Sequence, residues 1–71
     1  MYYVRRRRDN KYLYYINQES TSYSELRSAI PLNTIEMATE FKHFAELHDV
    51  DETFEIVNVL VTITAVDESE K

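Results

Sequence analysis

Residues 1–17 combine two runs of strand-forming residues with a turn signal between them. Tyr2–Val4 and Tyr12–Ile16 are rich in Tyr, Val and Ile, which favour strands, and Asp9-Asn10 lies between the runs. Asn and Asp tolerate the positive φ that a tight hairpin needs. The pattern predicts a β-hairpin with a second strand over 11–17. Simple alternation would place Tyr12, Tyr14 and Ile16 on one face of that strand, and Leu13 and Tyr15 on the other.

Residues 18–32 carry weaker signals. Gln18–Ser22 is polar and predicts a connection, and Ser22 with Glu25 has the spacing of a capping box. A short helix is therefore expected over 23–28. Pro31 disfavours helix at the residue before it, so 29–32 is expected to be extended.

Residues 33–49 repeat their apolar side chains every three or four positions, which predicts an amphipathic helix. Asn33 stands three residues before Glu36, so Asn33 is expected to cap the helix start. The helix should end near His48 or Asp49. Its apolar stripe consists of Met37, Ala38, Phe41, Phe44, Ala45 and His48.

A last strand is predicted to begin near Thr53. Apolar residues alternate with other residues along it, which is typical of a strand with one buried face. The alternating set is Val57, Val59, Val61, Ile63 and Ala65. Residues 67–71 are charged and are expected to form a flexible tail.

These elements predict an α+β fold in the order β-β-short α-α-β. We expect a three-stranded antiparallel sheet with the main helix packed on one face. One domain would span 1–66. The predicted core sets the helix residues Met37, Phe41 and Phe44 against the strand residues Val57, Val59, Val61 and Ile63.

Composition narrows the classes of function. The 71 residues include no Cys and no Gly, which excludes disulfide scaffolds, thiolate zinc sites and Gly-rich phosphate loops. No apolar run approaches the roughly 18 residues of a membrane span, so no membrane association is expected. A core this small gives a low free energy of unfolding, and binding to a partner or to a second copy would stabilise the fold.

Charge is distributed unevenly although the net charge is −5. The run Arg5, Arg6, Arg7 and Arg8 admits three interpretations. It can serve the structure, by guarding a strand edge or pairing with acids of the same chain or of a second copy; it can bind a protein partner; or it can bind nucleic acid. In the last case, Tyr2, Tyr3 and Tyr12 would stack on bases. The negative net charge counts against general phosphate binding.

An acidic face is the second charged feature. It comprises Glu36, Glu40, Glu46, Asp49, Asp51 and Glu52. These carboxylates are a candidate protein-binding surface, or they are the solvated side of an exposed helix.

No catalytic or metal-binding constellation is visible. His43 and His48 are five residues apart, so they do not share a helix face as an i, i+4 metal pair would. The cluster around Asp49 and Asp51 lacks the Gly of a calcium loop. We therefore expect neither an enzyme nor a cofactor or metal.

The layout resembles small early-region proteins of temperate phages from Gram-positive bacteria. The similarity is carried by the opening 1–6, the hairpin residues 9–13, and Leu26, Ala29 and Leu32 leading into 33–38. The resemblance implies a protein of the bacterial cytoplasm that binds and modulates or inhibits a host protein, such as a defence protein. A small nucleic-acid-binding protein and a structural homodimer are the alternatives.

Overall fold

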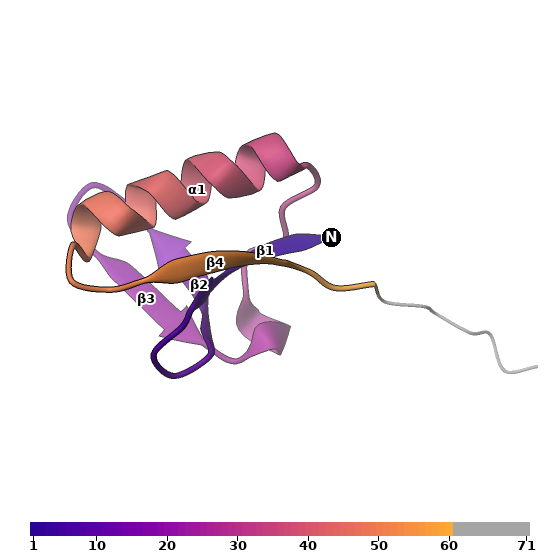
Figure 1. Cartoon of the computed structure of the whole chain (residues 1–71), viewed down its shortest axis with the longest axis horizontal. Helices are drawn as coiled ribbons and strands as arrows, with labels where there is room; N and C mark the ends of the chain where they lie inside the picture. The colour runs from indigo at the N-terminus through magenta and orange to yellow at the C-terminus, as the bar shows by residue number, and fades with distance from the viewer. Residues whose placement is uncertain (61–71) are drawn as a thin grey trace, which may run out of the picture.

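The computed structural model describes residues 1–60. It contains four strands, one short 3-10 helix and one α-helix (Figure 1). In chain order these are β1 (Tyr2–Arg6), β2 (Lys11–Ile16), β3 (Thr21–Ser24), η1 (Leu26–Ser28), α1 (Ile35–His48) and β4 (Phe54–Asn58).

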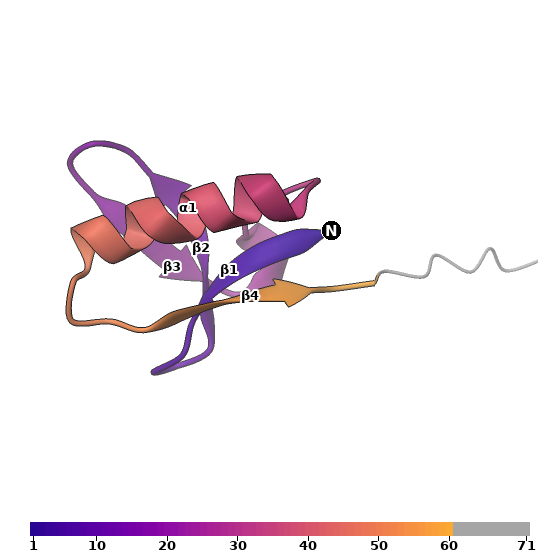
Figure 2. The same ribbon diagram turned by 45° about the horizontal axis from the view of Figure 1, so that its top comes forward.

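The α+β class is confirmed, but the sheet has four strands, not the predicted three. Their order is β3-β2-β1-β4, and every neighbouring pair is antiparallel. Helix α1 lies on one side of the sheet and η1 on the other (Figures 1 and 2). The predicted hairpin between β1 and β2 is confirmed, and Asn10 adopts the expected positive φ of 58°.

Strand β3 is the element that the sequence interpretation missed. Asn17 reverses the chain: its side-chain oxygen accepts hydrogen bonds from the backbone N–H groups of Glu19 and Ser20, each at 2.8 Å. A local side-chain turn of this kind brings the next residues back alongside β2. The predicted polar connection is therefore a hairpin turn followed by a strand.

The predicted short helix over 23–28 is correspondingly wrong in extent. Residues up to Ser24 belong to β3, and only the single 3-10 turn of η1 follows. The expected capping box does not form, because Ser22 lies within the strand and Glu25, at the start of η1, makes no side-chain cap.

A register shift between Leu13 and Tyr15 changes the faces of β2. An extra residue in one strand reverses the alternation beyond it. Leu13 and Ile16 therefore both pack into the core, while Tyr14 and Tyr15 are exposed. The predicted sharing of one face by Tyr14 and Ile16 is wrong for this reason.

The extended segment 29–32 closes one end of the sheet. Leu32 forms an isolated antiparallel bridge with Tyr2, with N···O distances of 2.8 and 3.0 Å. Leu32 is only 1% exposed, so this passage also contributes a core side chain.

Helix α1 begins one residue later than the Asn33 cap predicted. Thr34 is the cap, and its side chain accepts a hydrogen bond from the Met37 N–H at 3.2 Å. The helix ends at His48, as expected, and the Asp49 N–H bonds to the Ala45 carbonyl.

The core differs from the predicted one. On α1, Ala38 and Ala45 are fully buried, whereas Met37 and Phe44 are exposed and Phe41 is half-buried. The small alanines let the helix approach the sheet closely, and the bulky members of the stripe lie to one side of that contact line. The buried set is Val4, Leu13, Leu32, Ala38, Ala45 and Phe54.

Strand β4 turns the opposite face to the helix from the one predicted. Phe54 is buried and Ile56 packs against the core, so Val57 and Val59 face away from α1. The predicted continuation of this strand through Val61, Ile63 and Ala65, and the tail 67–71, lie outside the described residues.

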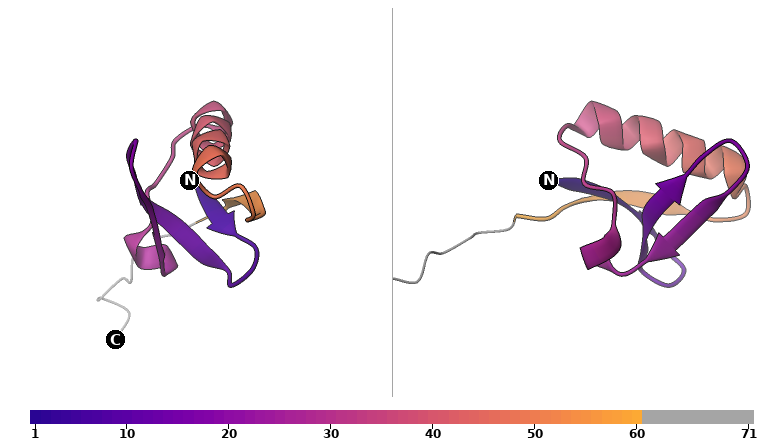
Figure 3. Two further views of the ribbon diagram at one scale, coloured as in Figure 1. Left: turned by 90° about the vertical axis from the view of Figure 1, so that its left-hand side faces the viewer. Right: turned by 180° about the vertical axis from the view of Figure 1, so that it is seen from behind.

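Helix α1 packs against β1 and β4 (Figure 3). A helix is about 10 Å wide and strands are about 4.8 Å apart, so one helix covers about two strands. The helix-side face of β2 and β3 is therefore only partly covered, and this gap defines the site described next.

Candidate functional site

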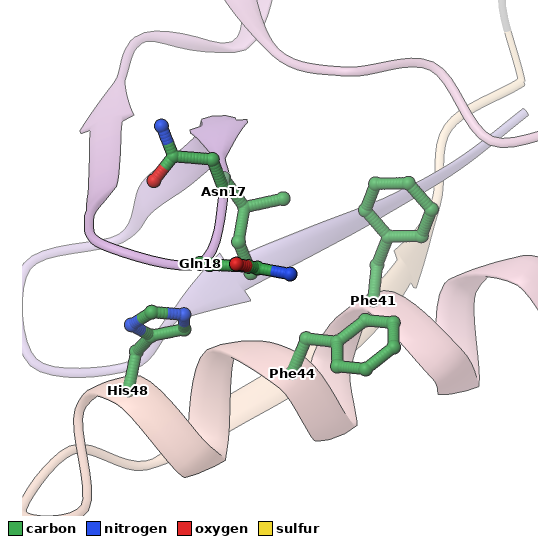
Figure 4. A pocket seen from close by; sticks show the side chains of 6 residues that line it. Asn17, Gln18, Phe41, Phe44 and His48 are labelled. Atoms are coloured by element: carbon green, nitrogen blue, oxygen red, sulfur yellow. The ribbon is translucent and has the colours of Figure 1, made fainter.

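A groove runs between α1 and the end of the β2–β3 hairpin, with a volume of about 420 Å³. We call it the α1–β2 groove. Figure 4 shows the side chains of Phe41, Phe44 and His48 on α1 and the hairpin turn opposite them, where Gln18 extends toward the helix and the Asn17 amide points away from it. Its lining consists of Ile16, Asn17, Gln18, Phe41, Phe44 and His48.

The groove is mainly apolar because of how α1 is rotated on the sheet. Phe41, Phe44 and His48 fall within about 60° of one another on a helical wheel, on the flank next to the alanine contact line. Phe44 is 45% exposed. A half-exposed phenylalanine beside a concave apolar surface provides a ready anchor for another chain.

Acidic side chains flank this apolar surface. Glu40 lies one helical turn before Phe44, Glu36 lies one turn before Glu40, and Glu19 follows Gln18 in the hairpin turn. All three are exposed, and none enters an ion pair within residues 1–60. The groove is thus apolar at its centre and negative at its margins.

Asp49 connects the C-terminal end of α1 to strand β3, and this contact closes one end of the groove. Its carboxylate accepts hydrogen bonds from the Tyr23 hydroxyl at 2.5 Å and the Thr21 hydroxyl at 2.7 Å. These bonds lower the pKa of Asp49. Burial, together with the bond to Asp49, raises the pKa of Tyr23 to about 12.

The arginine run is paired with the chain's own carboxylates. Arg5 bonds to Glu55 through Nε at 2.6 Å, and Arg7 lies 3.8 Å from the same carboxylate. Arg8 is 2.7 Å from Glu52. Each of these arginines thus has a carboxylate from the β4 side of the molecule.

Arg6 is the least exposed of the four arginines. It is 2.7 Å from Asp9 and 3.8 Å from Glu52, and its guanidinium carbon lies 4.2 Å from the centre of the Tyr23 ring. The structure thus favours the self-paired interpretation of the arginine run over free cationic groups.

Tyr12, the aromatic candidate for base stacking, lies on the face of the sheet away from α1. Its ring meets that of Tyr3 edge to face, with centroids 6.2 Å apart, and Arg5 lies 6.0 Å from its centre. Tyr2 packs against the core on the other face. The candidate tyrosines therefore do not form one surface.

The predicted acidic face is also divided. Glu36 and Glu40 remain exposed on α1, and Glu46 bonds to Lys42 at 2.9 Å. Asp49 is engaged with β3, and Glu52 with the arginines. Asp51 lies with Arg7 and Arg8 beside a separate hollow at the hairpin end.

Within residues 1–60, no group of three or more acidic or histidine side chains is arranged to hold a metal ion. His43 contacts the neighbouring Phe44 ring, and His48 lines the groove. In the same part of the chain, no helix is long and apolar enough to cross a membrane.

The sequence interpretation named the aromatic residues of the groove but assigned them to the core. Ile16, Asn17 and Gln18 were assigned to the second strand and to the connection after it, and none of them was proposed as a site residue. One signal was present: Ala38 and Ala45, seven residues apart, mark the line of closest approach on the helix. Bulky residues to one side of such a line remain free to form a surface.

Comparisons of this chain with protein-family models, with curated proteins and with solved structures give no match.

Proposed function

We propose that the protein is a non-enzymatic interaction protein that modulates or inhibits a partner protein by binding it stoichiometrically. The binding site is the α1–β2 groove. The observation that carries this proposal is the half-exposed Phe44 beside Phe41. Both line a groove that exists because one helix is too narrow to cover the face of β2 and β3. No catalytic group is needed for such a role.

The chemistry of the groove defines the partner. Its apolar centre fits the apolar stripe of an amphipathic helix, which commonly binds in grooves of this kind. Glu19, Glu36 and Glu40 at the margins favour Lys or Arg beside that stripe. The partner segment is therefore a cationic amphipathic helix.

The arginine pairing favours this proposal over nucleic-acid binding. Neutralising phosphates requires cations that are free to exchange counterions. In residues 1–60, each of Arg5–Arg8 already lies within 4 Å of a carboxylate. Binding to nucleic acid would have to break these pairs.

The test uses two equally exposed positions on opposite flanks of α1. Phe44 faces the groove and is 45% exposed, whereas Ile35 lies on the other flank and is 44% exposed. A photo-cross-linking amino acid placed at either position should leave the fold intact. We expect a single adduct of defined mass from position 44 in the cells that make the protein, and none of the same mass from position 35.

The captured protein is then purified and its binding to the unmodified chain is measured by calorimetry. We expect a 1:1 complex through a helix with Lys or Arg beside its apolar stripe. Phe44→Ser should weaken it by at least about tenfold, and Ile35→Ser should have little effect. The proposal would be overturned if both variants weakened binding equally, or if the partner lacked such a helix. It would also be overturned if the protein bound DNA or RNA in a salt-sensitive way and replacing Arg5–Arg8 by Ser abolished that binding.

A further inference from the structure

Strand β4 lies at the end of the sheet and pairs with β1 on one side only. The Val59 N–H bonds to the Met1 carbonyl, and the Arg7 N–H bonds to the Thr53 carbonyl. In an antiparallel ladder, backbone groups alternate between the two sides of a strand. The backbone N–H and C=O groups of the odd-numbered residues in 53–59 therefore point toward β1.

The N–H and C=O groups of Phe54, Ile56 and Asn58 consequently point to the free edge. Within residues 1–60, no hydrogen bond engages these backbone groups. Three consecutive donor–acceptor sites of one edge strand are thus open.

This edge lacks the features that usually block strand pairing. Such features are proline, a bulge or unpaired charges. Strand β4 has no proline, and its register with β1 is continuous. Its one charged residue, Glu55, is paired with Arg5.

We infer that this edge is the site at which a second copy of the chain pairs, antiparallel and about a twofold axis at Ile56. Ile56 then faces Ile56 of the second copy, and Phe54 faces Asn58, so all three open sites are used on both strands. Glu55 lies opposite Val57 of the second copy, which keeps the like charges from facing each other directly. The strand is therefore self-complementary in hydrogen bonding and in charge.

The position of α1 supports the same arrangement. The helix packs on β1 and β4, so its axis lies midway between these strands, about half a strand spacing from β4. The twofold axis lies midway between the two β4 strands of the dimer, about half a strand spacing from β4 on its other side. The two helices would then lie on one face of an eight-stranded sheet, about 10 Å apart. This is an ordinary distance between packed helices.

The helix flank that turns to the second copy is the one opposite the α1–β2 groove. It carries Ile35, 44% exposed, together with the ion pair of Lys42 and Glu46. Two antiparallel copies of this flank can exchange partners between Lys42 and Glu46. The grooves remain open on the outer flanks, so the dimer would present two of them.

Amide hydrogen exchange measured residue by residue tests the pairing directly. At low protein concentration, the amides of Glu55 and Val57 should be protected by β1, and those of Ile56 and Asn58 should exchange fast. Raising the concentration should slow exchange at Ile56 and Asn58 by at least about tenfold, with sedimentation giving a dimer mass. A monomer at all concentrations, species larger than a dimer, or protection without alternation would overturn the inference.

A matched pair of variants isolates the edge. Asn58→Ala keeps the outward N–H, whereas Asn58→Pro removes it without touching the bonds to β1, and prolines are tolerated on edge strands. Both variants lose the Asn58 side chain, which accepts a hydrogen bond from the amino terminus. We expect Asn58→Ala to dimerise and Asn58→Pro to raise the dimer dissociation constant at least about tenfold. The circular dichroism spectrum of both variants should be unchanged. Equal dimerisation by both variants would overturn the inference.

This inference and the proposed function fail separately. Phe44→Ser should weaken partner binding by at least about tenfold and leave the dimer intact, because Phe44 lies on the outer flank of α1. Asn58→Pro should raise the dimer dissociation constant at least about tenfold and leave the cross-link from position 44 unchanged.

Discussion

The two halves of the sheet differ in what lies over them. On β1 and β4, α1 packs through Ala38 and Ala45, and Val4 and Phe54 are buried. On β2 and β3, the same helix leaves a groove with a half-exposed phenylalanine at its margin. One helix of 14 residues cannot cover four strands. The covered half therefore holds most of the buried side chains, although Leu13 of β2 is buried too, and the other half offers a surface for binding.

The sharpest test of this comparison is the same substitution in each half. Phe54→Ala removes a side chain that is 5% exposed and stacks on Tyr23, with centroids 5.8 Å apart. We expect it to lower the free energy of unfolding by about 3–5 kcal/mol, because a buried cavity remains. Phe44→Ala should change that free energy by less than about 1 kcal/mol. Urea denaturation of both variants measures the two values, and similar losses would contradict the division of roles.

A smaller effect is expected from the contact that ties α1 to β3 across the uncovered half. Asp49 accepts two hydroxyl hydrogen bonds from β3, so Asp49→Ala should cost about 1–3 kcal/mol of unfolding free energy. The replacement leaves the Tyr23 and Thr21 hydroxyls without their acceptor.

The pH dependence of this contact has a defined sign. The pKa of Asp49 is lower in the folded chain than in the unfolded chain, so its contribution is present above the ordinary Asp pKa and is lost as the pH falls. The stability difference between the wild type and Asp49→Asn should therefore shrink on acidification. Chemical denaturation at a series of pH values measures it, and a difference that is constant or grows in acid would contradict the account.

The hairpin, the main helix and the α+β class could be predicted because each has a local cause. Asp9-Asn10 fixes the first turn, and the spacing of apolar residues fixes α1. Strand β3 could not be recognised in the same way, because all four of its residues carry hydroxyl groups and its partner is β2. Edge strands of this kind take their structure from pairing more than from their own sequence.

The core and the groove depended on tertiary packing. Strand β4 has apolar residues on both faces, Phe54 and Ile56 on one and Val57 on the other, so alternation alone does not tell which face meets the helix. On α1, the apolar stripe is wider than the contact with two strands. The excess width, Phe44 above all, forms the candidate site. Apolar spacing alone does not separate these residues from the core, because the number of strands beneath the helix decides how much of the stripe is covered.

The smallest effect is expected at the hairpin tip, which lies away from both halves of the comparison. Asp9 is exposed, pairs with Arg6 and accepts a hydrogen bond from the Lys11 N–H, and these contacts lower its pKa to about 2. Its stabilising contribution is therefore complete above about pH 4 and is lost as the pH falls through about 2. Asp9→Asn should destabilise the fold slightly at neutral pH, and the two denaturation curves should converge in acid.

Solvent and salt distinguish this effect from that of Asp49. Water screens an exposed ion pair, so added salt should reduce the difference between the wild type and Asp9→Asn. The Asp49 contact consists of hydrogen bonds from uncharged hydroxyls in a partly buried position, so the effect of Asp49→Asn should change little with salt. Equal salt sensitivity of the two variants would mean that Asp49 acts mainly through charge. Its attachment of α1 to β3 would then no longer explain how the uncovered half holds its shape.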